Sequence, residues 1–510
     1  MNKVNYLMPI NLGNLIKRPG LGERIALIDL RQPDRPQSFS AKKFNDNIRA
    51  FARGLLNLGI KQGQRVGFLS ENRWEMLIGY FATMYMGAVA VPINHKFPKG
   101  IIKHIVEDSE LSLIFFDDER RPLIPDNVKI LGFDDGLFEN FLDEGPLNEF
   151  VPDPNDIAEI LYTSGSTGMP KGVLLTHKGQ LWAIDKYCEP LEREGFSGGS
   201  LIVAPLYHMN ALFYSSICIY NARPIILQPR FSPESYMHAV MSYQCTQLSG
   251  VPTMFAMLAN LNEELLSADK SFVTNIGIGS APLSCALLDQ VKNMFPSAKI
   301  SNGYGSTEAG PAIFGPHPKG LPRPELSIGY PFEGVEWRLT GGTNHNEGEL
   351  ELKTGAMSPG YLNRRDADQE RFQDGWFRTN DIMRCDEDGF MYFISRADDM
   401  FVCGGENIFP GEVEAVLNRH PDVQDSVVVG APDDIKGMVP VAFVVKIPDA
   451  RPNEENIKSF CLENGPVYAH PRRVLFKEKL PIGGTHKIDR RSLEIEALQL
   501  MISAGRFKES

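Results

Sequence analysis

The most informative stretch of the sequence is Tyr162–Gly172, which reads Tyr-Thr-Ser-Gly-Ser-Thr-Gly-Met-Pro-Lys-Gly. It follows the apolar run Ile157–Leu161, which predicts a strand that leads directly into a loop. Glycines let a backbone approach phosphate oxygens, hydroxyl groups add hydrogen-bond donors, and Lys171 adds a positive charge. The stretch therefore indicates a loop that holds a polyphosphate, with an ordinary Gly/Ser turn as the alternative. It is not a P-loop, because that motif needs Ser or Thr after the lysine and Gly172 stands there.

Length and charge limit the classes of protein to which the chain can belong. With 510 residues the chain is too long for one ordinary core and predicts about two to four packed units. The hydrophobic fraction of 43% and the charged fraction of 23% are typical of a globular protein. The net charge of -12 offers no general attraction to nucleic acids or to anionic membranes, so we expect no nucleic-acid partner.

The seven cysteines and the apolar segments indicate the compartment. No two cysteines form a C-x-x-C pair, so the spacing supports neither a zinc site nor a disulfide framework and favours a reducing, cytoplasmic compartment. Met76–Asn94 is uncharged and long enough to span a bilayer, but glycines and Pro92 interrupt it. We interpret this segment as a buried helix, Trp74–Met86, followed by a core strand, Ala88–Pro92. We therefore expect no stable membrane insertion.

Up to Ser306 the sequence alternates helical and strand patterns, which favours parallel sheets flanked by helices. The predicted strands are Arg65–Leu69, Leu111–Phe116, Leu201–Ala204, Pro224–Leu227 and Asn275–Ile278. The predicted helices are Phe51–Leu58, Ile101–Glu107, Pro233–Tyr243 and Leu283–Met294.

The pattern changes downstream of Glu325. Gly348–Lys353 alternates strictly between polar and apolar residues, which predicts a half-exposed antiparallel strand, and Met391–Ser395 is similar. A compact α+β pattern follows, with helices predicted at Gly411–Arg419 and Glu454–Asn464 and strands at Val423–Gly430 and Val439–Ile447. We place a boundary at the charged tetrapeptide Arg396–Asp399, which gives domains of residues 1–396 and 397–510.

The Tyr162–Gly172 loop closely resembles the signature loop of the adenylate-forming superfamily. This superfamily includes acyl-CoA and aryl-CoA synthetases, firefly luciferase and the adenylation domains of peptide synthetases. The resemblance extends over nearly the whole chain, with further motifs in the same order. It implies that the loop binds the phosphates of ATP through Thr163, Ser164, Gly165, Ser166, Thr167, Gly168 and Lys171, with Thr167 also a ligand of Mg2+.

Two further segments are similar to the superfamily's adenylate-binding motifs. Ser301–Glu308 resembles the second nucleotide segment, which implies that adenine stacks on Tyr304. The same resemblance puts the Thr307 hydroxyl near the α-phosphate and the Glu308 carboxylate on Mg2+. Gly279–Pro282 resembles the turn that lines the other face of adenine. The nucleotide-binding residues implied by both segments are Gly279, Ser280, Ala281, Pro282, Asn302, Gly303, Tyr304 and Gly305.

Trp376–Asp381 resembles the ribose-binding motif. The resemblance implies that Asp381 accepts hydrogen bonds from both ribose hydroxyls and that Arg396 also contacts the ribose. A solvated salt bridge is the alternative for Arg396. The chain departs from the superfamily at Asn380 and Ser395, where Gly is common, and at Cys403, where Ser is common. These departures concern local geometry rather than function.

Pro481–Arg490 resembles the loop that carries the superfamily's catalytic lysine. The resemblance implies that Lys487 stabilises the negative charge that develops on the α-phosphate during adenylation. His486 stands where Gly is common, so we expect a small difference in the loop backbone. On composition alone, Lys487 would be an ordinary surface lysine.

The resemblance also implies a second half-reaction. Asp398 occupies the hinge position about which the small domain of superfamily members rotates, with a plain linker aspartate as the alternative. Phe401–Pro410 resembles the segment that lines the pantetheine tunnel of coenzyme A after rotation. Gly404 would let the thiol arm pass close to the backbone.

The acyl pocket is the least defined part of the resemblance. Pro205–Phe213 resembles the segment that bears a gating aromatic residue or histidine, so His208 would lie near the reacting carboxylate, with a buried structural histidine as the alternative. Ser249–Thr253 and Ala309–Phe314 would form other walls. These walls are small or apolar and hold no obvious basic residue for a second carboxylate. They favour an aromatic or medium-chain aliphatic monocarboxylic acid.

The resemblance implies an α/β fold with a large N-terminal domain of two α/β subdomains plus a small β-barrel, and a smaller mobile C-terminal α+β domain. It implies an ATP-dependent carboxylic acid–CoA ligase that works through an acyl-adenylate with ATP, Mg2+ and coenzyme A. The alternative is an adenylate-forming ligase with another acceptor, such as a carrier protein. A catalytically silent nucleotide-binding protein is disfavoured because Lys487, Glu308, Asp381 and Arg396 are all present. A homodimer is possible.

Overall fold

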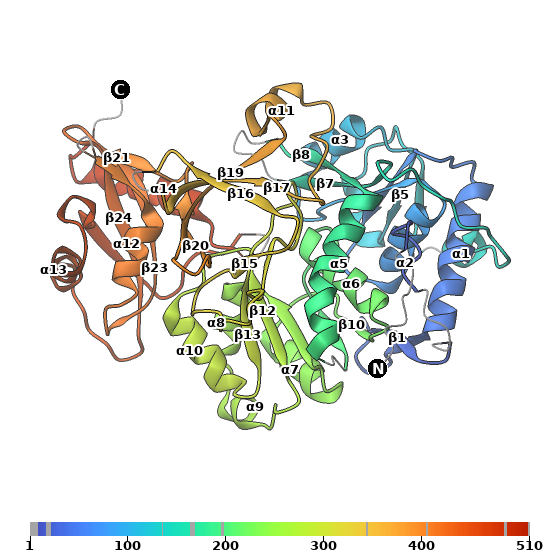
Figure 1. Cartoon of the computed structure of the whole chain (residues 1–510), viewed down its shortest axis with the longest axis horizontal. Coiled ribbons are helices and arrows are strands. Elements are labelled where there is room, and N and C mark those ends of the chain that lie inside the picture. The colour runs from blue at the N-terminus through green and yellow to red at the C-terminus, as the bar shows by residue number, and fades with distance from the viewer. Residues whose placement is uncertain are drawn as a thin grey trace.

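In the computed structural model of the chain, residues 401–507, drawn in orange and red, gather at one end beside the much larger body formed by the preceding residues (Figure 1). The structure describes residues 9–16, 22–134, 136–163, 169–194, 198–342, 345–403, 406–483 and 487–507. Two predominantly parallel sheets lie in the large body, and antiparallel strands connect it to the C-terminal part. This is the predicted division into α/β and α+β regions.

The first parallel sheet has the strand order β6-β5-β3-β4-β7-β8. Its strands are β3 (Arg65–Leu69), β4 (Val89–Pro92), β5 (Leu113–Phe116), β6 (Ile130–Gly132), β7 (Ile157–Thr163) and β8 (Lys171–Thr176). Only the β7–β8 pair is antiparallel. The helical segments of this region are α1 (Ala41–Asn57), α2 (Trp74–Tyr85), α3 (Lys99–Asp108), η1 (Asp118–Leu123) and α4 (Leu137–Phe141). The predicted strands at residues 65–69 and 111–116 are confirmed, the second from Leu113 onward.

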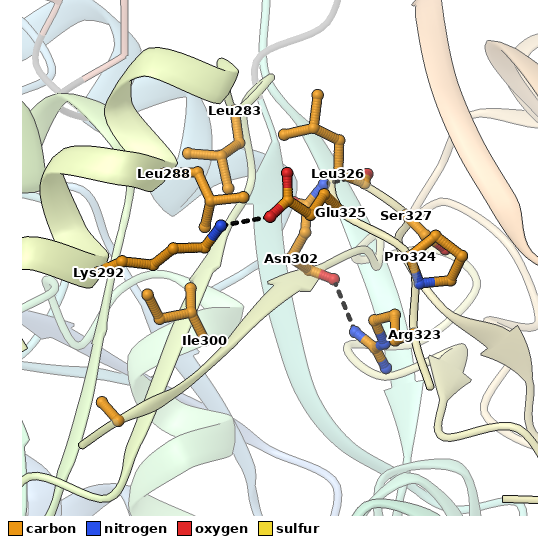
Figure 2. Close-up of a pocket in the computed structure, with 11 residues that line it drawn as sticks. Leu283, Leu288, Lys292, Ile300, Asn302, Arg323, Pro324, Glu325, Leu326 and Ser327 are labelled. Carbon is orange, nitrogen blue, oxygen red and sulfur yellow. Dashed lines mark hydrogen bonds and ion pairs between the residues drawn. The ribbon is translucent and has the colours of Figure 1, made fainter. Parts of the chain in front are cut away.

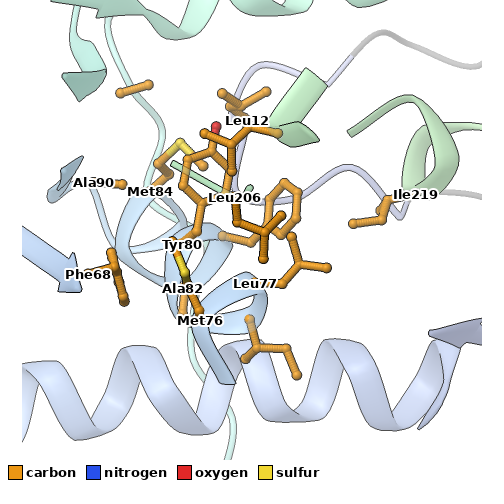
Figure 3. Close-up of a cluster of buried hydrophobic side chains, with 14 of the residues drawn as sticks. Leu12, Phe68, Met76, Leu77, Tyr80, Ala82, Met84, Ala90, Leu206 and Ile219 are labelled. Atoms are coloured by element: carbon orange, nitrogen blue, oxygen red, sulfur yellow. The ribbon is translucent and has the colours of Figure 1, made fainter. Parts of the chain in front are cut away.

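Helix α2 is buried on almost every side, as the uncharged segment predicts. Figure 3 shows Met76, Leu77 and Tyr80 of α2 packed with side chains from distant parts of the chain. Tyr80 is 2% exposed and Leu77 is fully buried. Within the described ranges, no helix is both long and apolar enough to cross a membrane.

The second parallel sheet has the order β13-β12-β11-β9-β10-β1-β2, with only β1 and β2 antiparallel. Its strands are β1 (Ile25–Asp29), β2 (Gln37–Ser40), β9 (Ser200–Ile202), β10 (Ile225–Leu227), β11 (Gln247–Gly250), β12 (Asn275–Gly279) and β13 (Lys299–Gly303). The helices of this region are α5 (His177–Glu194), α6 (Met209–Tyr220), α7 (Pro233–Ser242), α8 (Pro252–Leu258), α9 (Glu263–Ser267) and α10 (Cys285–Met294). Ile276 and Ile278 of β12 pack with Leu287 and Val291 of α10 in one apolar core.

Antiparallel strands follow at the position predicted for a small barrel. They are β16 (Glu336–Thr340), β17 (Glu347–Lys353), β18 (Phe372–Gln373), β19 (Trp376–Cys385) and β20 (Met391–Arg396), with the short helix α11 (Arg365–Arg371). A two-stranded ribbon, β14 (Phe314–Gly315) and β15 (Tyr330–Pro331), joins this sheet through a bridge between Gly329 and Met391. Glu351 in β17 is only 7% exposed and accepts from Arg338 Nε at 2.7 Å. Strand β17 is thus more buried than strict alternation predicts.

The C-terminal part has its own apolar core, in which Val427, Val441 and Phe443 are at most 1% exposed. Its strands are β21 (Phe401–Cys403), β22 (Glu406–Ile408), β23 (Val423–Asp433), β24 (Gly437–Lys446) and β25 (Arg473–Lys477). Its helical segments are α12 (Pro410–Leu417), α13 (Glu454–Asn464), η2 (Val467–Ala469) and α14 (Arg490–Ser503). The α+β pattern predicted from Pro410 onward is confirmed.

Candidate active site

The carboxyl ends of β12 and β13 bring the two predicted adenine-binding segments together. Gly279 and Gly303, the last residues of these strands, are register partners in the parallel pair. The chain turns at Ser280, whose φ of 65° lies in the left-handed region, and Tyr304 follows directly after Gly303. Ligands of open α/β sheets bind outside the carboxyl ends of the strands. The segments at residues 279–282 and 302–305 therefore form one candidate nucleotide site.

Tyr304, Asp381 and Arg396 form a polar cluster at this site. The Tyr304 hydroxyl donates to Asp381 Oδ2 at 2.5 Å, and Arg396 Nη1 donates to Asp381 Oδ1 at 3.0 Å. The antiparallel pairing of β19 with β20 sets the second contact, because Asp381 and Arg396 are register partners. Burial raises the pKa of the Asp381 carboxyl, although the Arg396 guanidinium acts in the opposite direction. Both carboxylate oxygens of Asp381 are thus held in a fixed orientation.

The backbone at Asn380 explains one departure from the superfamily. Asn380 has a φ of 58°, in the left-handed region, where glycine carries no steric cost and asparagine is among the better tolerated alternatives. After the amide is turned to its hydrogen-bonded orientation, its nitrogen donates to Glu349 Oε1 at 3.2 Å and its oxygen accepts from Arg371 Nη1 at 3.1 Å. Asn380 therefore supplies a conformation that glycine commonly supplies, and side-chain contacts anchor it.

Lys487 reaches this cluster from the C-terminal part. Its backbone carbonyl accepts from the amide of Gly483 at 2.7 Å, and a bridge joins Ile482 with Ile488, so a narrow hairpin presents the lysine. Lys487 is exposed as a residue. Desolvation by the surrounding protein, and then the charge of Arg396, lowers the pKa of Lys487, whereas Asp381 raises it. The structure thus places the predicted catalytic lysine within electrostatic reach of the predicted ribose-binding pair.

A second group of residues lies beside the predicted phosphate loop. Thr163 and Lys171 are register partners at the ends of β7 and β8, so the loop between them closes an antiparallel pair. Lys171 Nζ lies 5.5 Å from the centroid of the Tyr361 ring. The Tyr361 hydroxyl in turn donates to Glu308 Oε1 at 3.0 Å. Tyr361 therefore connects the base of the phosphate loop to the predicted Mg2+ ligand, and no sequence motif singled it out.

Thr307 and Glu308 lie at the tip of a tight turn. The amides and carbonyls of Ser306 and Gly310 bond reciprocally at 3.0 Å, and the Ser306 hydroxyl accepts from the Ala309 amide at 3.0 Å. Over the described part of the chain, no group of three or more His, Cys, Asp or Glu side chains could hold a metal. A single carboxylate nevertheless fits Mg2+, which commonly takes one or two carboxylates and substrate phosphates.

Other predicted residues lie elsewhere or outside the described ranges. Asn302 faces away from the nucleotide turn, because its amide nitrogen donates to the Leu326 carbonyl at 2.9 Å. His208 precedes α6, and its ring lies 4.6 Å from that of Tyr207. The predicted residues Ser164, Gly165, Ser166, Thr167, Gly168 and Gly404, together with His486, lie outside the described residues.

The hinge region is bound to both parts of the chain. Arg396 binds Asp398 with Nε and Nη2, both at 2.9 Å, in a two-pronged contact. Arg490 begins α14, three positions after Lys487, and its Nε lies 3.9 Å from Asp399 Oδ2. Arg490 Nη2 also donates to Glu414 Oε1 at 2.8 Å. These contacts tie the lysine-bearing loop to the segment predicted as the hinge.

Comparison with known proteins agrees with the motifs and the fold. A model of the AMP-binding enzyme family matches residues 18–362, and a model of the AMP-binding enzyme C-terminal domain matches residues 412–487. The chain is 31% identical over 480 residues to a 2-succinylbenzoate–CoA ligase of Geobacillus kaustophilus (strain HTA426), covering 92% of this chain and 95% of the relative.

Two solved structures extend the similarity to three dimensions. The structure of an anthranilate CoA ligase in complex with anthranoyl-AMP superposes with a TM-score of 0.85 at 25% identity, covering 98% of this chain and 100% of that chain. An o-succinylbenzoate coenzyme A synthetase from Bacillus subtilis, in complex with ATP and a magnesium ion, superposes with a TM-score of 0.78 at 26% identity, covering 92% and 96%. The chain therefore belongs to the AMP-binding enzyme family, within the adenylate-forming superfamily.

Proposed function

We propose that this protein is an ATP-dependent carboxylic acid–CoA ligase that works through an acyl-adenylate. The observation that supports the proposal is that Lys487, from the C-terminal part, lies within electrostatic reach of Asp381 and Arg396 of the large body. This arrangement suits adenylation, because a cation from one part meets a nucleotide site on the other. The similarity to CoA ligases over nearly the whole chain supports the choice of coenzyme A as acceptor.

In the first half-reaction an oxygen of the substrate carboxylate attacks the α-phosphorus of ATP. A new O–P bond forms, the bond to the β-phosphate oxygen breaks, and pyrophosphate leaves. Lys487 donates to the nonbridging oxygens as their negative charge grows, and donors aimed at such charge stabilise a transition state. Tyr304 supports the adenine, Asp381 and Arg396 orient the ribose, and Thr307 lies near the α-phosphate.

The polyphosphate is held at the other end of the site. Thr163 and Lys171 flank the phosphate loop, and Ser164, Gly165, Ser166 and Gly168, which lie outside the described residues, would bind the phosphates. Glu308 and Thr167 would hold Mg2+, which supplies charge neutralisation of the polyphosphate when it is bound. Tyr361 orients Glu308 through its hydroxyl group.

In the second half-reaction the thiolate of coenzyme A attacks the carbonyl carbon of the adenylate. The C–S bond forms, the C–O bond to phosphate breaks, and AMP leaves. We propose that the domains are residues 1–396 and 397–510, and that the smaller one rotates about Asp398 between the two steps. After rotation Gly404, which lies outside the described residues, would face the pantetheine arm.

The substrate is an aromatic or medium-chain aliphatic monocarboxylic acid, with His208 near its carboxylate. Two of the similar proteins are named for ring-bearing acids, 2-succinylbenzoate and anthranilate, which supports the aromatic choice. All seven cysteines are free, which supports a reducing, cytoplasmic compartment.

The test is mass-spectrometric product analysis with ATP, Mg2+ and a panel of carboxylic acids, with and without coenzyme A. We expect AMP together with an acyl-CoA, and only the adenylate when coenzyme A is left out. An acyl-adenylate without thioester would identify another acceptor. Formation of ADP, or no nucleotide turnover across the panel, would contradict the proposed mechanism.

A further inference from the structure

Arg490 is the first residue of α14 and lies three positions after Lys487. The buried apolar residues of this helix begin only at Leu493, and Ile488, ahead of the helix, is only partly buried. The first turn of a helix has unpaired amides and frays unless side chains hold it. The position of Lys487 therefore depends on the contacts that hold the start of α14.

Arg490 binds the start of α14 to strand β23 and helix α12. Its Nη1 donates to the backbone carbonyl of Val428 in β23 at 2.9 Å. Its Nη2 donates to Oε1 and Oε2 of Glu414 in α12 at 2.8 and 3.1 Å. Glu414 Oε1 also accepts from the Val428 amide at 2.8 Å. Arg490, Glu414 and the backbone of Val428 thus form a closed ring of hydrogen bonds.

This ring lies in the interior of the C-terminal part. Val428 is fully buried, and Glu414 is 8% exposed. Over the described residues β23 pairs only with β24, so a buried amide or carbonyl on its other edge needs a partner from outside the sheet. Glu414 is that partner for the Val428 amide, and Arg490 is that partner for the carbonyl. Opening the ring would leave buried polar groups unpaired, which is costly.

The ion pair of Lys292 and Glu325 in the large body shows the contrasting, exposed case. It lies on a cavity of about 210 Å³ between α10 and the 323–327 segment, and Figure 2 shows the lysine amine directed at the glutamate carboxylate. These two side chains are 42% and 65% exposed, so water can replace either partner. The side chains of Arg490 and Glu414 are 27% and 10% exposed. Their contact therefore fixes its partners more firmly than an exposed ion pair does.

The position that is fixed at Arg490 is passed to Lys487 through Asp489. The Asp489 amide donates to the Pro481 carbonyl at 2.9 Å, which joins the far arm of the hairpin to the start of the helix. The Asp489 carboxylate accepts from the Ser492 amide at 3.2 Å as the N-cap of α14. A displacement of Arg490 would therefore displace Lys487.

We propose that Arg490 is a positioning residue for adenylation, whose buried contacts with Glu414 and Val428 hold Lys487 at the nucleotide site. This inference rests on the proposed function, in which Lys487 stabilises charge on the α-phosphate. Arg490 acts through Lys487 and has no part of its own in the chemistry.

The test measures pyrophosphate release by Arg490→Met, by Lys487→Met and by the variant that carries both substitutions, with an acid that the panel identifies. We expect Arg490→Met to lower kcat by about 10- to 100-fold, because a displacement of about 1 Å in a catalytic group commonly has an effect of this size. The KM for ATP should stay within about two-fold, because the donor that is misplaced acts on charge that grows only in the transition state. The double variant should be no slower than Lys487→Met, since no lysine is left to position.

Two further measurements separate positioning from loss of the fold. Arg490→Lys keeps a cation beside Glu414 but cannot bind the carboxylate and the Val428 carbonyl with a planar fork, so it should show a smaller loss of kcat in the same direction. It decides the question if Arg490→Met does not fold. In each variant, thioester formation from a supplied acyl-adenylate should keep the rate of the unsubstituted enzyme.

Arg491→Met is the matched control, because Arg491 is the next residue of α14 and is exposed. Lys292→Met removes the exposed ion pair of Figure 2, and both controls should leave kcat for adenylation unchanged. An unchanged kcat in the Arg490 variants, an equal loss in both half-reactions, or losses that multiply in the double variant would overturn the inference while the proposed function stands. No nucleotide turnover by the unsubstituted enzyme across the panel would overturn the proposed function and this inference together.

Discussion

Lys487 is separated in sequence from the other residues of the nucleotide site, and the fold brings it to them. Its amine lies within electrostatic reach of Asp381 and Arg396, and its hairpin is fixed by the bond between Gly483 and its own carbonyl. Desolvation and the Arg396 charge lower the pKa of Lys487, so the charged form of this amine is less stable than that of an ordinary surface lysine. The negative charge of a bound phosphate would offset this destabilisation.

We therefore expect Lys487→Met to lower the rate of adenylation by about 10²- to 10³-fold, the usual cost of removing one donor from a developing anion. Pyrophosphate release measures this step. Thioester formation from a chemically supplied acyl-adenylate should stay at the rate of the unsubstituted enzyme, because the lysine acts only in the first half-reaction.

Lys479→Met is the control, because Lys479 is an exposed lysine of the same part of the chain. It should leave both half-reactions unchanged. Equal losses in both half-reactions of Lys487→Met would argue for a structural role of this lysine instead.

At the scale of single elements, strand β7 combines a phosphate loop with a buried acid. Glu159 lies in β7, is 1% exposed, and accepts from the Tyr80 hydroxyl at 3.0 Å. Burial raises the pKa of Glu159 from 4.5 to about 7, and the Tyr80 hydrogen bond opposes this shift only partly.

This shift makes the stability of the fold depend on pH. Because the folded-state pKa exceeds the unfolded value, Glu159 stabilises the fold below pH 4.5, and that contribution is lost as the pH rises to about 7. The loss is on the order of 3 kcal/mol. Glu159→Gln should remove this dependence and raise the free energy of unfolding above pH 7, measured by urea denaturation between pH 5 and pH 8.

Glu107→Gln in α3 provides the comparison, since Glu107 is an exposed carboxylate. Its denaturation midpoint should follow the unsubstituted protein at every pH. If Glu159→Gln keeps the original pH dependence, then other groups cause it.

The helices and strands show which sequence signals were sufficient to predict their bounds. Strand β3 and helix α13 have the predicted bounds, because each is a short apolar or capped segment with clear ends. Helix α1 begins ten residues before the predicted start, at Ala41, where the Ser40 hydroxyl accepts from the Lys43 amide as an N-cap. The cap and the spacing of Phe44, Ile48 and Phe51 were present in the sequence, but the polar residues between them concealed the helix.

The residues of the candidate site also fall into two groups, those that the local sequence predicts and those that it does not. Tyr304 and Asp381 lie in motifs, so local sequence predicts them, and the structure shows them in contact. Tyr361 could not be predicted, because its partner Glu308 is brought near only by the fold. No local pattern distinguishes Tyr361 from an ordinary tyrosine.

At the scale of the whole molecule, ion pairs gather where the two parts of the chain are joined. Arg396, the last residue of β20, binds Asp381 within the large body and Asp398 of the connecting segment, and Arg490 of α14 lies near Asp399. Such ion pairs exchange partners more readily than apolar contacts, since each ion can be rehydrated. We therefore propose that the arrangement with Lys487 at the nucleotide site is one of two states.

If the small part rotates about Asp398, then fixing the backbone there should separate the two half-reactions. Proline holds φ near -65° and restricts the preceding residue, here Ala397, so Asp398→Pro should hinder rotation while leaving the present arrangement accessible. We expect pyrophosphate release to persist in a single turnover and acyl-CoA formation from supplied adenylate to fall by about 10²-fold or more, because binding energy cannot offset a blocked domain motion. Asp398→Ala removes the contact with Arg396 without restricting φ, and it should retain both half-reactions. If Asp398→Pro formed acyl-CoA as fast as Asp398→Ala, the hinge would lie elsewhere, and the free thiol would have to reach the adenylate with Lys487 still in place.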